Sequence, residues 1–282
     1  QLMKTISSVS EFRKFRKQLK GSVGFVPTMG ALHGGHLSLV KKSISVCNYT
    51  IVSIFLNPTQ FSIDEDLSSY PRTIEKDLML LKGMKVDAVF VPSSKKIYLE
   101  NHSTFIYENS LTKHLEGSSR PHFFQGVTTI VAKLFNIVQP SHSFFGEKDA
   151  QQLIVVKKMV KDLNYAIEIV SCPTIRDKNG LAMSSRNQYL SKTSRLSASI
   201  IYLSLSKAIA LLDSGEKDPS VIKKKIEKTI SKESSLNIDY IMVSDKDTLE
   251  EITNSSWRNI LISLAVYIEG VRLIDNVSYI SK

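Results

Sequence analysis

The sequence predicts an α/β protein, with a parallel sheet in the first part of its 282 residues and a smaller α+β unit after it. Two observations support this prediction. Before Pro173, short apolar segments alternate with segments of helical periodicity, which is the pattern of a parallel sheet covered on both faces. After Pro173, two helical segments precede three strand-like segments. We therefore expect two domains, residues 1–174 and 175–282.

The individual elements are predicted from hydrophobic periodicity. In the first part, strand-like segments cover 23–27, 50–56, 87–91, 143–145 and 166–170, and helical segments cover 35–46, 71–82, 127–138 and 149–163. The segment 50–56 (TIVSIFL) is rich in apolar and β-branched residues, whereas Val127, Ile130 and Leu134 recur at helical spacing. In the second part, helices are predicted over 194–212 and 219–232, and strands over 238–243, 260–268 and 273–279.

Composition limits the class of protein. Hydrophobic residues make up 42% and charged residues 23%, which is typical of a globular chain and excludes wholesale disorder. No apolar run reaches about 18 residues, and the first residues lack the apolar core of a signal peptide, so we expect neither a membrane span nor secretion. Two distant cysteines, Cys47 and Cys172, exclude a disulfide framework and favour a reducing, cytoplasmic location.

The net charge of +10 favours anionic partners, which include nucleotides, carboxylates, nucleic acid and membrane surfaces, without choosing among them. A glycine-rich segment narrows the choice. Residues 27–36 (PTMGALHGGH) follow a predicted strand and open a predicted helix, where backbone N–H groups can bind phosphate. His33 and His36, three positions apart at the helix start, can both face such an anion. The dinucleotide and P-loop fingerprints are absent, and the motif alone is also compatible with a turn that carries two surface histidines.

Two later segments carry further groups that suit an anionic substrate. The segment 145–149 (FGEKD) lies at another strand-to-helix junction, where Lys148 can neutralise phosphate charge. The segment 183–187 (MSSRN) offers two hydroxyls and a guanidinium in succession. Taken alone, each segment is better explained as a capped helix start or a polar loop than as a binding site.

Six motifs agree in order and spacing with one known family. They are PTMGALHGGH at 27–36, NPTQF at 57–61, YPRT at 70–73, GVTTIVAKLFNIVQP at 126–140, FGEKDAQQL at 145–153 and GLAMSSRNQYLS at 180–191. Through them the chain resembles the pantoate–β-alanine ligase (pantothenate synthetase) family over essentially its full length. The His-x-x-His element is shared with the wider nucleotidyltransferase superfamily. The resemblance implies a Rossmann-like N-terminal domain, a smaller C-terminal lid domain and a homodimer.

The resemblance also implies a reaction. ATP and pantoate would form pantoyl adenylate and pyrophosphate with the help of Mg²⁺, and the amine of β-alanine would then displace AMP to give pantothenate. Negative charge builds up on phosphate in the first step, so catalysis should rest on positioning and charge stabilisation. These small molecules, and neither nucleic acid nor a membrane, are the expected partners.

The family's functional residues are carried over position by position. The ATP site would comprise Met29, Gly30, Ala31, Leu32, His33, Gly34, Gly35, His36, Gly146, Glu147, Lys148, Asp149, Ile175, Met183, Ser184, Ser185 and Arg186. The catalytic groups would be His36, His33, Lys148, Ser184, Ser185 and Arg186. Gln60 and Gln152 would bind pantoate, and Gln60 would also lie close to β-alanine. Asn57 is a weaker candidate for the same pocket, and no residue is assigned as a metal ligand.

One stretch departs from the family pattern. The family has Arg-x-x-His-Phe-x-Gly-Val before its long helix, whereas here His122 stands one position early and Phe123 takes its usual place. Either a local shift keeps His122 near the site or its role is lost. Asp77 is weighed as a magnesium contact but expected to be a surface acid on a helix. The acidic residues at 64–66 are expected in an exposed loop beside the site.

Two other functions fit parts of the pattern. A nucleotidyltransferase with a nucleotide-linked product, such as a cytidylyltransferase, would share the His-x-x-His element, but Gln60, Gln152 and the Ser-Ser-Arg segment argue against it. A nucleic-acid-binding protein would explain the positive charge, but no RNA-binding module is recognisable.

Overall fold

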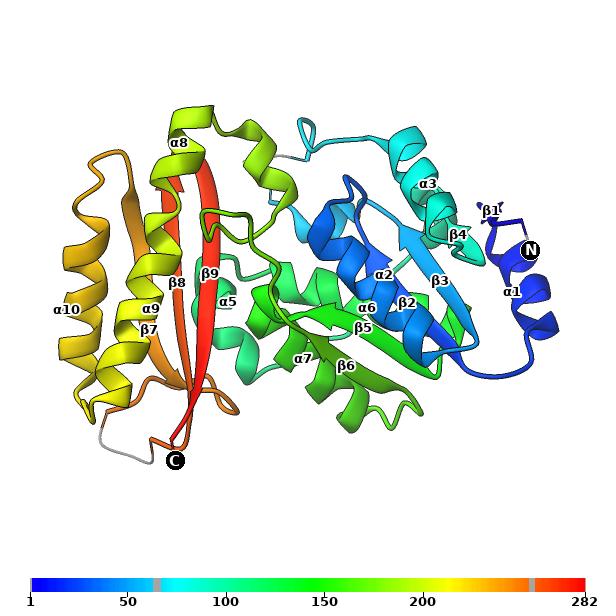
Figure 1. The fold of residues 1–282 in the computed structure, drawn as a ribbon. Helices are drawn as coiled ribbons and strands as arrows, with labels where there is room; N and C mark the ends of the chain where they lie inside the picture. Colours follow the sequence, from blue (N-terminus) through cyan, green and yellow to red (C-terminus); the bar gives the residue numbers. More distant parts are fainter. Residues whose placement is uncertain (1, 63–66, 254–256, 282) are drawn as a thin grey trace.

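The computed structural model describes residues 2–62, 67–253 and 257–281, so Asp64, Glu65 and Asp66, expected in an exposed loop, lie outside the described residues. The described chain forms a six-stranded parallel sheet and a three-stranded antiparallel sheet (Figure 1). The predicted fold class is confirmed.

The parallel sheet has the strand order β1-β4-β3-β2-β5-β6. Its strands are β1 (Lys4–Ile6), β2 (Val23–Thr28), β3 (Tyr49–Ile54), β4 (Ala88–Phe90), β5 (His142–Gly146) and β6 (Glu168–Cys172). Strands β2, β3 and β4 progress in one direction across the sheet, and the chain then returns to place β5 on the other side of β2. The order therefore reverses between β2 and β5.

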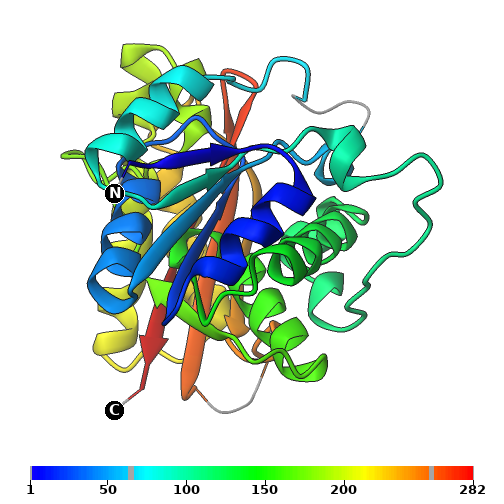
Figure 2. The ribbon, with the colours of Figure 1, turned by 90° about the vertical axis from the view of Figure 1, so that its right-hand side faces the viewer.

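Helices cover both faces of this sheet (Figure 2). Helices α1 (Val9–Gln18), α6 (Phe123–Val138) and α7 (Ala150–Asp162) share one apolar core with Phe25 and Phe90 of the strands. Helices α2 (Gly34–Val46) and α3 (Ile74–Gly83) share the other core with Val26 and Val52. Short helical turns lie in the connections: η1 (Pro58–Gln60), α4 (Ser94–Ile97), η2 (Leu111–Lys113), α5 (Leu115–Ser119) and η3 (Glu147–Asp149).

The second sheet lies between helices α9 and α10 on one side and the helices that cover the parallel sheet on the other. It consists of β7 (Asn237–Asp245), β8 (Asn259–Ile268) and β9 (Val271–Ile280), and η4 (Ser185–Tyr189), α8 (Lys192–Ser197), α9 (Ile200–Asp213) and α10 (Pro219–Ile230) precede it. Helices α9 and α10 cover its outer face (Figure 1), and their apolar residues form a core with Ile262 and Leu264. Leu261 belongs instead to the core of α6 and α7. The side chains of β8 thus contribute to the cores on both sides.

Several boundaries differ from the predictions. The helix expected over 194–212 is two helices, α8 and α9, and α6 begins four residues before the expected Val127. Strand β1 was not predicted, because three residues at a sheet edge give too short a pattern, and the ten-residue helix α1 was not predicted either. The expected division between residues 174 and 175 stays a prediction, although β6 ends at Cys172.

One helical stretch among the described residues, 192–213, is apolar enough to span a membrane by length and composition alone, although it holds no unbroken apolar run of about 18 residues. The expectation considered only unbroken apolar runs. In the structure, Ile201, Leu205 and Ala208 of this stretch are buried in the core that α9 forms with the antiparallel sheet.

Candidate active site

A crevice opens where the strand order of the parallel sheet reverses. Strands β2 and β5 are paired only at Gly24 with His142 and at Phe25 with Ser143. On either side, pairing continues to the strand ends, as far as Thr28 in β2 and Gly146 in β5. The carboxyl ends of β2 and β5 therefore separate, and this is the position at which open α/β sheets bind ligands.

A cavity of about 780 Å³ occupies this crevice and extends under the antiparallel sheet. Of the predicted site residues, Met29, His33, Gly35, His36, Gln60, Gly146, Lys148, Asp149, Gln152, Ile175, Met183, Ser184, Ser185 and Arg186 line it. Gly30, Ala31, Leu32, Gly34 and Glu147 do not appear in this lining. The histidine, lysine and serine–arginine segments, far apart in sequence, thus border one space.

A buried carboxylate shapes the loop that carries the histidines. Asp77, 1% exposed, accepts hydrogen bonds from the N–H groups of Ala31 and Leu32, both at 2.9 Å. Thr73 Oγ1 donates to the same carboxylate at 3.1 Å. The loop needs this support because Ala31 has a left-handed φ of 50° and Gly30 a φ of 86°. The prediction that Asp77 is a surface acid is therefore wrong. Asp77 does not line the cavity, so it is not placed as a magnesium contact either.

The side chains of the two histidines accept hydrogen bonds from backbone N–H groups at the start of helix α2. His33 Nδ1 accepts from the Gly35 N–H at 3.1 Å, and His36 Nδ1 accepts from the His33 N–H at 3.4 Å. A ring nitrogen that accepts carries no proton, so each neutral imidazole has its hydrogen on Nε2. Burial lowers the pKa of His36 to about 3, and burial together with the nearby Lys148 lowers the pKa of His33 to about 4. Both rings are thus neutral hydrogen-bond donors at neutral pH.

The serine–arginine segment packs directly on the histidine loop. Ser185 Oγ donates to the Ala31 carbonyl at 3.1 Å. A Cβ on Gly34 would lie 2.8 Å from the Met183 sulfur, so a larger residue there would displace the Met183 side chain. Ser184 caps η4 by accepting from the Arg186 N–H at 3.3 Å. The hydroxyl of Ser185 is therefore already used to join two walls of the cavity.

The orientation of the Gln60 amide follows from its neighbour Asn57, which is 1% exposed. Asn57 Nδ2 donates to the Gly126 carbonyl at 3.1 Å, and because a carbonyl only accepts, this contact fixes the Asn57 amide. The same Nδ2 donates to Gln60 Oε1 at 2.9 Å. Gln60 therefore keeps its NH₂ group for a ligand, and Asn57, which does not line the cavity, orients Gln60.

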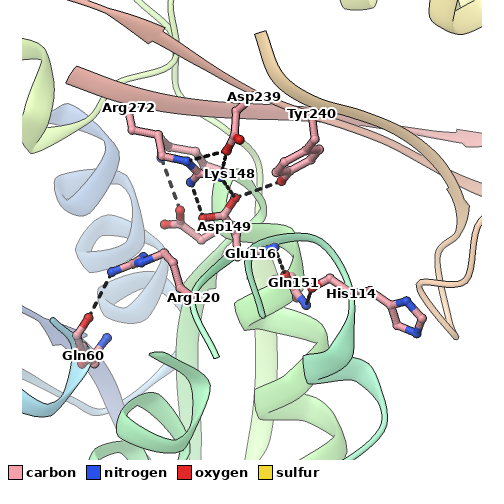
Figure 3. A network of polar contacts seen from close by, with 10 residues as sticks. All are labelled: Gln60, His114, Glu116, Arg120, Lys148, Asp149, Gln151, Asp239, Tyr240 and Arg272. Carbon is pink, nitrogen blue, oxygen red and sulfur yellow. Dashed lines mark hydrogen bonds and ion pairs between the residues drawn. The ribbon is translucent and has the colours of Figure 1, made fainter. Parts of the chain in front are cut away.

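The shifted histidine lies away from the site. His122 is exposed at the start of α6 and does not line the cavity, whereas Phe123 does. The ring of Phe123 lies under the guanidinium of Arg120, with the central carbon 4.0 Å from the ring centroid. Arg120 in turn donates to the Gln60 carbonyl at 3.0 Å (Figure 3). The structure thus favours the loss of a role for His122.

Comparison with known proteins agrees with this geometry. The family model described as pantoate–β-alanine ligase matches residues 1–278. The chain belongs to the pantoate–β-alanine ligase family. Pantothenate synthetase of Thermosipho africanus is 48% identical over 278 residues, covering 98% of this chain and 99% of that protein. The Acetivibrio thermocellus pantothenate synthetase is 49% identical over 277 residues, covering 98% of each.

Solved structures of the ligase family share the whole fold. The crystal structure of pantothenate synthetase from Thermus thermophilus matches with a TM-score of 0.92 at 39% identity, covering 98% of this chain and 99% of that one. Pantoate–β-alanine ligase from Francisella tularensis, described as complexed with beta-gamma ATP and beta-alanine, matches with a TM-score of 0.79 at 37% identity. It covers 98% of this chain and 97% of that one.

An ion cluster at the cavity wall of this ligase-family chain was not predicted from the sequence (Figure 3). Arg272 of β9 contacts both carboxylate oxygens of Glu116 in α5, at 2.5 and 3.0 Å. Arg272 also donates to Asp239 at 2.7 Å, and Tyr240 OH donates to Glu116 at 3.0 Å. Burial, and then the charge of Glu116, raise the pKa of Tyr240. No local pattern marks these residues, because their partners are distant in sequence.

Proposed function

We propose that this chain joins pantoate and β-alanine in two steps, through a pantoyl-adenylate intermediate. The observation that supports this best is the common cavity of His33, His36, Lys148, Arg186, Gln60 and Gln152. It combines donors and positive charges for a triphosphate with amides for a polar acid. ATP-dependent ligation is the activity that the family implies, and the adenylate route accounts for this set of side chains.

In the first step, a pantoate carboxylate oxygen attacks the α-phosphorus of ATP, and the bond to the pyrophosphate oxygen breaks. The acid becomes an acyl group with a good leaving group. Negative charge increases on the α-phosphate and the departing pyrophosphate. The Nε2–H groups of His33 and His36 and the charges of Lys148 and Arg186 would stabilise it. Because its Nδ1 accepts and its pKa is low, His36 would act as a neutral hydrogen-bond donor.

In the second step, the amine of β-alanine attacks the acyl carbon, the bond to the phosphate oxygen breaks, AMP leaves with that oxygen and the new amide nitrogen loses a proton to water. No side chain needs to form a covalent bond. The NH₂ group of Gln60 would donate to pantoate, beside the approaching β-alanine, and Gln152 would complete the pantoate pocket. The backbone of Ile175 would contact adenine.

Magnesium fits this site as an ion that arrives with ATP. Among the described residues, no cluster of three or more His, Cys, Asp or Glu side chains is placed to hold a metal. Mg²⁺ often binds through one or two carboxylates, waters and substrate phosphates. Asp149, which lines the cavity beside Lys148, would be the carboxylate available to it. When bound, the ion would neutralise part of the triphosphate charge.

We also propose a homodimer, a cytoplasmic location, and a division into residues 1–174 and a lid of 175–282. The family resemblance supports the dimer and the lid. Cys47 and Cys172 are free thiols, which suits a reducing compartment.

A substrate-omission assay tests the reaction. Pyrophosphate should form from ATP and pantoate alone, whereas steady AMP release should require β-alanine as well. The same assay with CTP in place of ATP tests the cytidylyltransferase alternative. A nucleotide retained in the product, or AMP release independent of pantoate, would refute the proposal.

A further inference from the structure

We propose that Asn276, on β9 of the second sheet, is a positioning residue for adenylate formation, acting through Lys148. This inference rests on the proposed function. No motif of the sequence singled out Asn276, and it lies 128 residues from Lys148. It reaches the site only because β9 packs against the turn η3 that carries the lysine.

The contact fixes two consecutive peptide groups. Asn276 Nδ2 donates to the Glu147 carbonyl at 3.0 Å and to the Lys148 carbonyl at 2.8 Å. Both hydrogens of one amide are thus used on the backbone of a three-residue turn. Asn276 is 9% exposed, so these bonds are largely shielded from competing water. The path of the turn decides where the Lys148 side chain begins.

Asn276 is itself held in place. Its N–H donates to Asp275 Oδ1 at 2.8 Å, and Asp275, 3% exposed, forms a bidentate pair with Arg176 at 2.5 and 2.9 Å. The Arg176 guanidinium also lies 3.8 Å from the ring centroid of Tyr202. Asn276 therefore presents its amide from a rigid strand segment.

These contacts link two parts of the proposed ATP site. Arg176 directly follows Ile175, which would contact adenine, and Lys148 would contact the phosphates. Adjacent residues of β9 hold both segments, Asp275 through Arg176 and Asn276 through the η3 carbonyls. A single strand can thus keep the adenine and phosphate parts of the site in register.

The hydrogen bonds of Asn276 affect the rate of adenylate formation because they position Lys148. Lys148 has a flexible side chain and acts as a point charge, so its effect depends on where its backbone lies. A misplacement of about 1 Å can cost about 100-fold in rate. Without the Asn276 amide, the η3 turn loses both donors, and we expect kcat for adenylate formation to fall more than the KM for ATP rises.

The test compares Asn276→Asp and Asn276→Ala with Asn237→Ala. Asn276→Asp keeps the size but replaces the donors by an oxygen that faces two carbonyls, and Asn276→Ala guards against misfolding caused by the new charge. Asn237 is an exposed residue at the start of β7 and serves as the control. We expect adenylate formation, measured as single-turnover pyrophosphate release, to fall roughly 10- to 100-fold in both Asn276 variants and to be unchanged in Asn237→Ala.

A double-mutant cycle with Lys148→Met separates positioning from a general structural role. If Asn276 acts through Lys148, Asn276→Ala should lower the rate less than about 2-fold further once the lysine is absent. A loss of the same factor in both backgrounds, a wild-type rate in Asn276→Ala, or a loss that only tracks unfolding would overturn the inference. Wild-type protein that forms no pyrophosphate from ATP and pantoate would instead refute the proposed function.

Discussion

Asp77→Asn tests whether one buried carboxylate holds the histidine loop. The carboxylate accepts from two backbone N–H groups and one hydroxyl, at 2.9, 2.9 and 3.1 Å. Asparagine keeps one acceptor but turns an NH₂ group toward the other buried N–H. A hydrogen bond to a charged group contributes about 1.5–3 kcal/mol, and an unsatisfied buried donor costs about 1–3 kcal/mol. Asparagine is also cheaper to bury, so we expect a net loss of about 2 kcal/mol.

This loss can be measured in two ways. Urea denaturation should show a free energy of unfolding lower by about 2 kcal/mol. If the loop instead rearranges while the rest stays folded, kcat/KM for ATP should fall up to about 30-fold, since each 1.4 kcal/mol is a factor of ten. Glu75→Gln, at an exposed position on the same helix, is the matched control. An Asp77→Asn variant equal to wild type in both stability and ATP kinetics would refute the anchoring role.

Three further predictions use other parts of the site. Because the pKa values of His33 and His36 in the folded protein, about 4 and 3, lie below the ordinary 6.5, protonation favours the unfolded state. The free energy of unfolding should therefore fall as pH drops below about 6.5, by up to about 1.4 kcal/mol per pH unit for each ring. Urea denaturation at pH 7 and at pH 5 measures this fall, which should be smaller in His36→Gln than in the wild type. An equal fall in the two proteins would contradict the lowered pKa of His36. Gln60→Glu replaces the inward NH₂ by a negative oxygen, so the KM for pantoate should rise at least about 10-fold while that for ATP changes little; equal changes would argue against the assigned orientation. Arg272→Met leaves Glu116 buried without its cation and should cost about 3 kcal/mol in denaturation, whereas the double variant with Glu116→Met should recover much of the loss; no recovery would show that the pair is not the cause.

The sequence was sufficient for features that repeat or lie close together along the chain. Strand–helix alternation predicted the parallel sheet, because burial on both faces imposes a local pattern on every strand. The segments 27–36, 145–149 and 183–187 were candidate site segments because each gathers groups that suit an anion, although none of them identified a site by itself. Their family resemblance then supplied the site residues that line the cavity.

Features that depend on partners from distant segments were not predictable in this way. The role of Asp77 was missed, because an acid on an amphipathic helix looks the same whether it faces water or a loop from another strand. The orientation of Gln60 depends on Asn57 and the Gly126 carbonyl, which meet only when α6 packs on η1. The exposed position of His122 likewise depended on where α6 begins.

What the amino-acid sequence determined by itself is thus the fold class, the order of most elements and the chemical types gathered for phosphate and acid. What the tertiary structure decided is which atoms those groups present. The two imidazoles are neutral with hydrogen on Nε2, the Gln60 amide directs its NH₂ group toward the cavity, and β9 holds the turn that carries Lys148. The physical reason is that the burial of one face of a helix or strand imposes a hydrophobic pattern on consecutive residues of the chain. Hydrogen-bond direction and pKa, in contrast, depend on neighbours that only folding brings together.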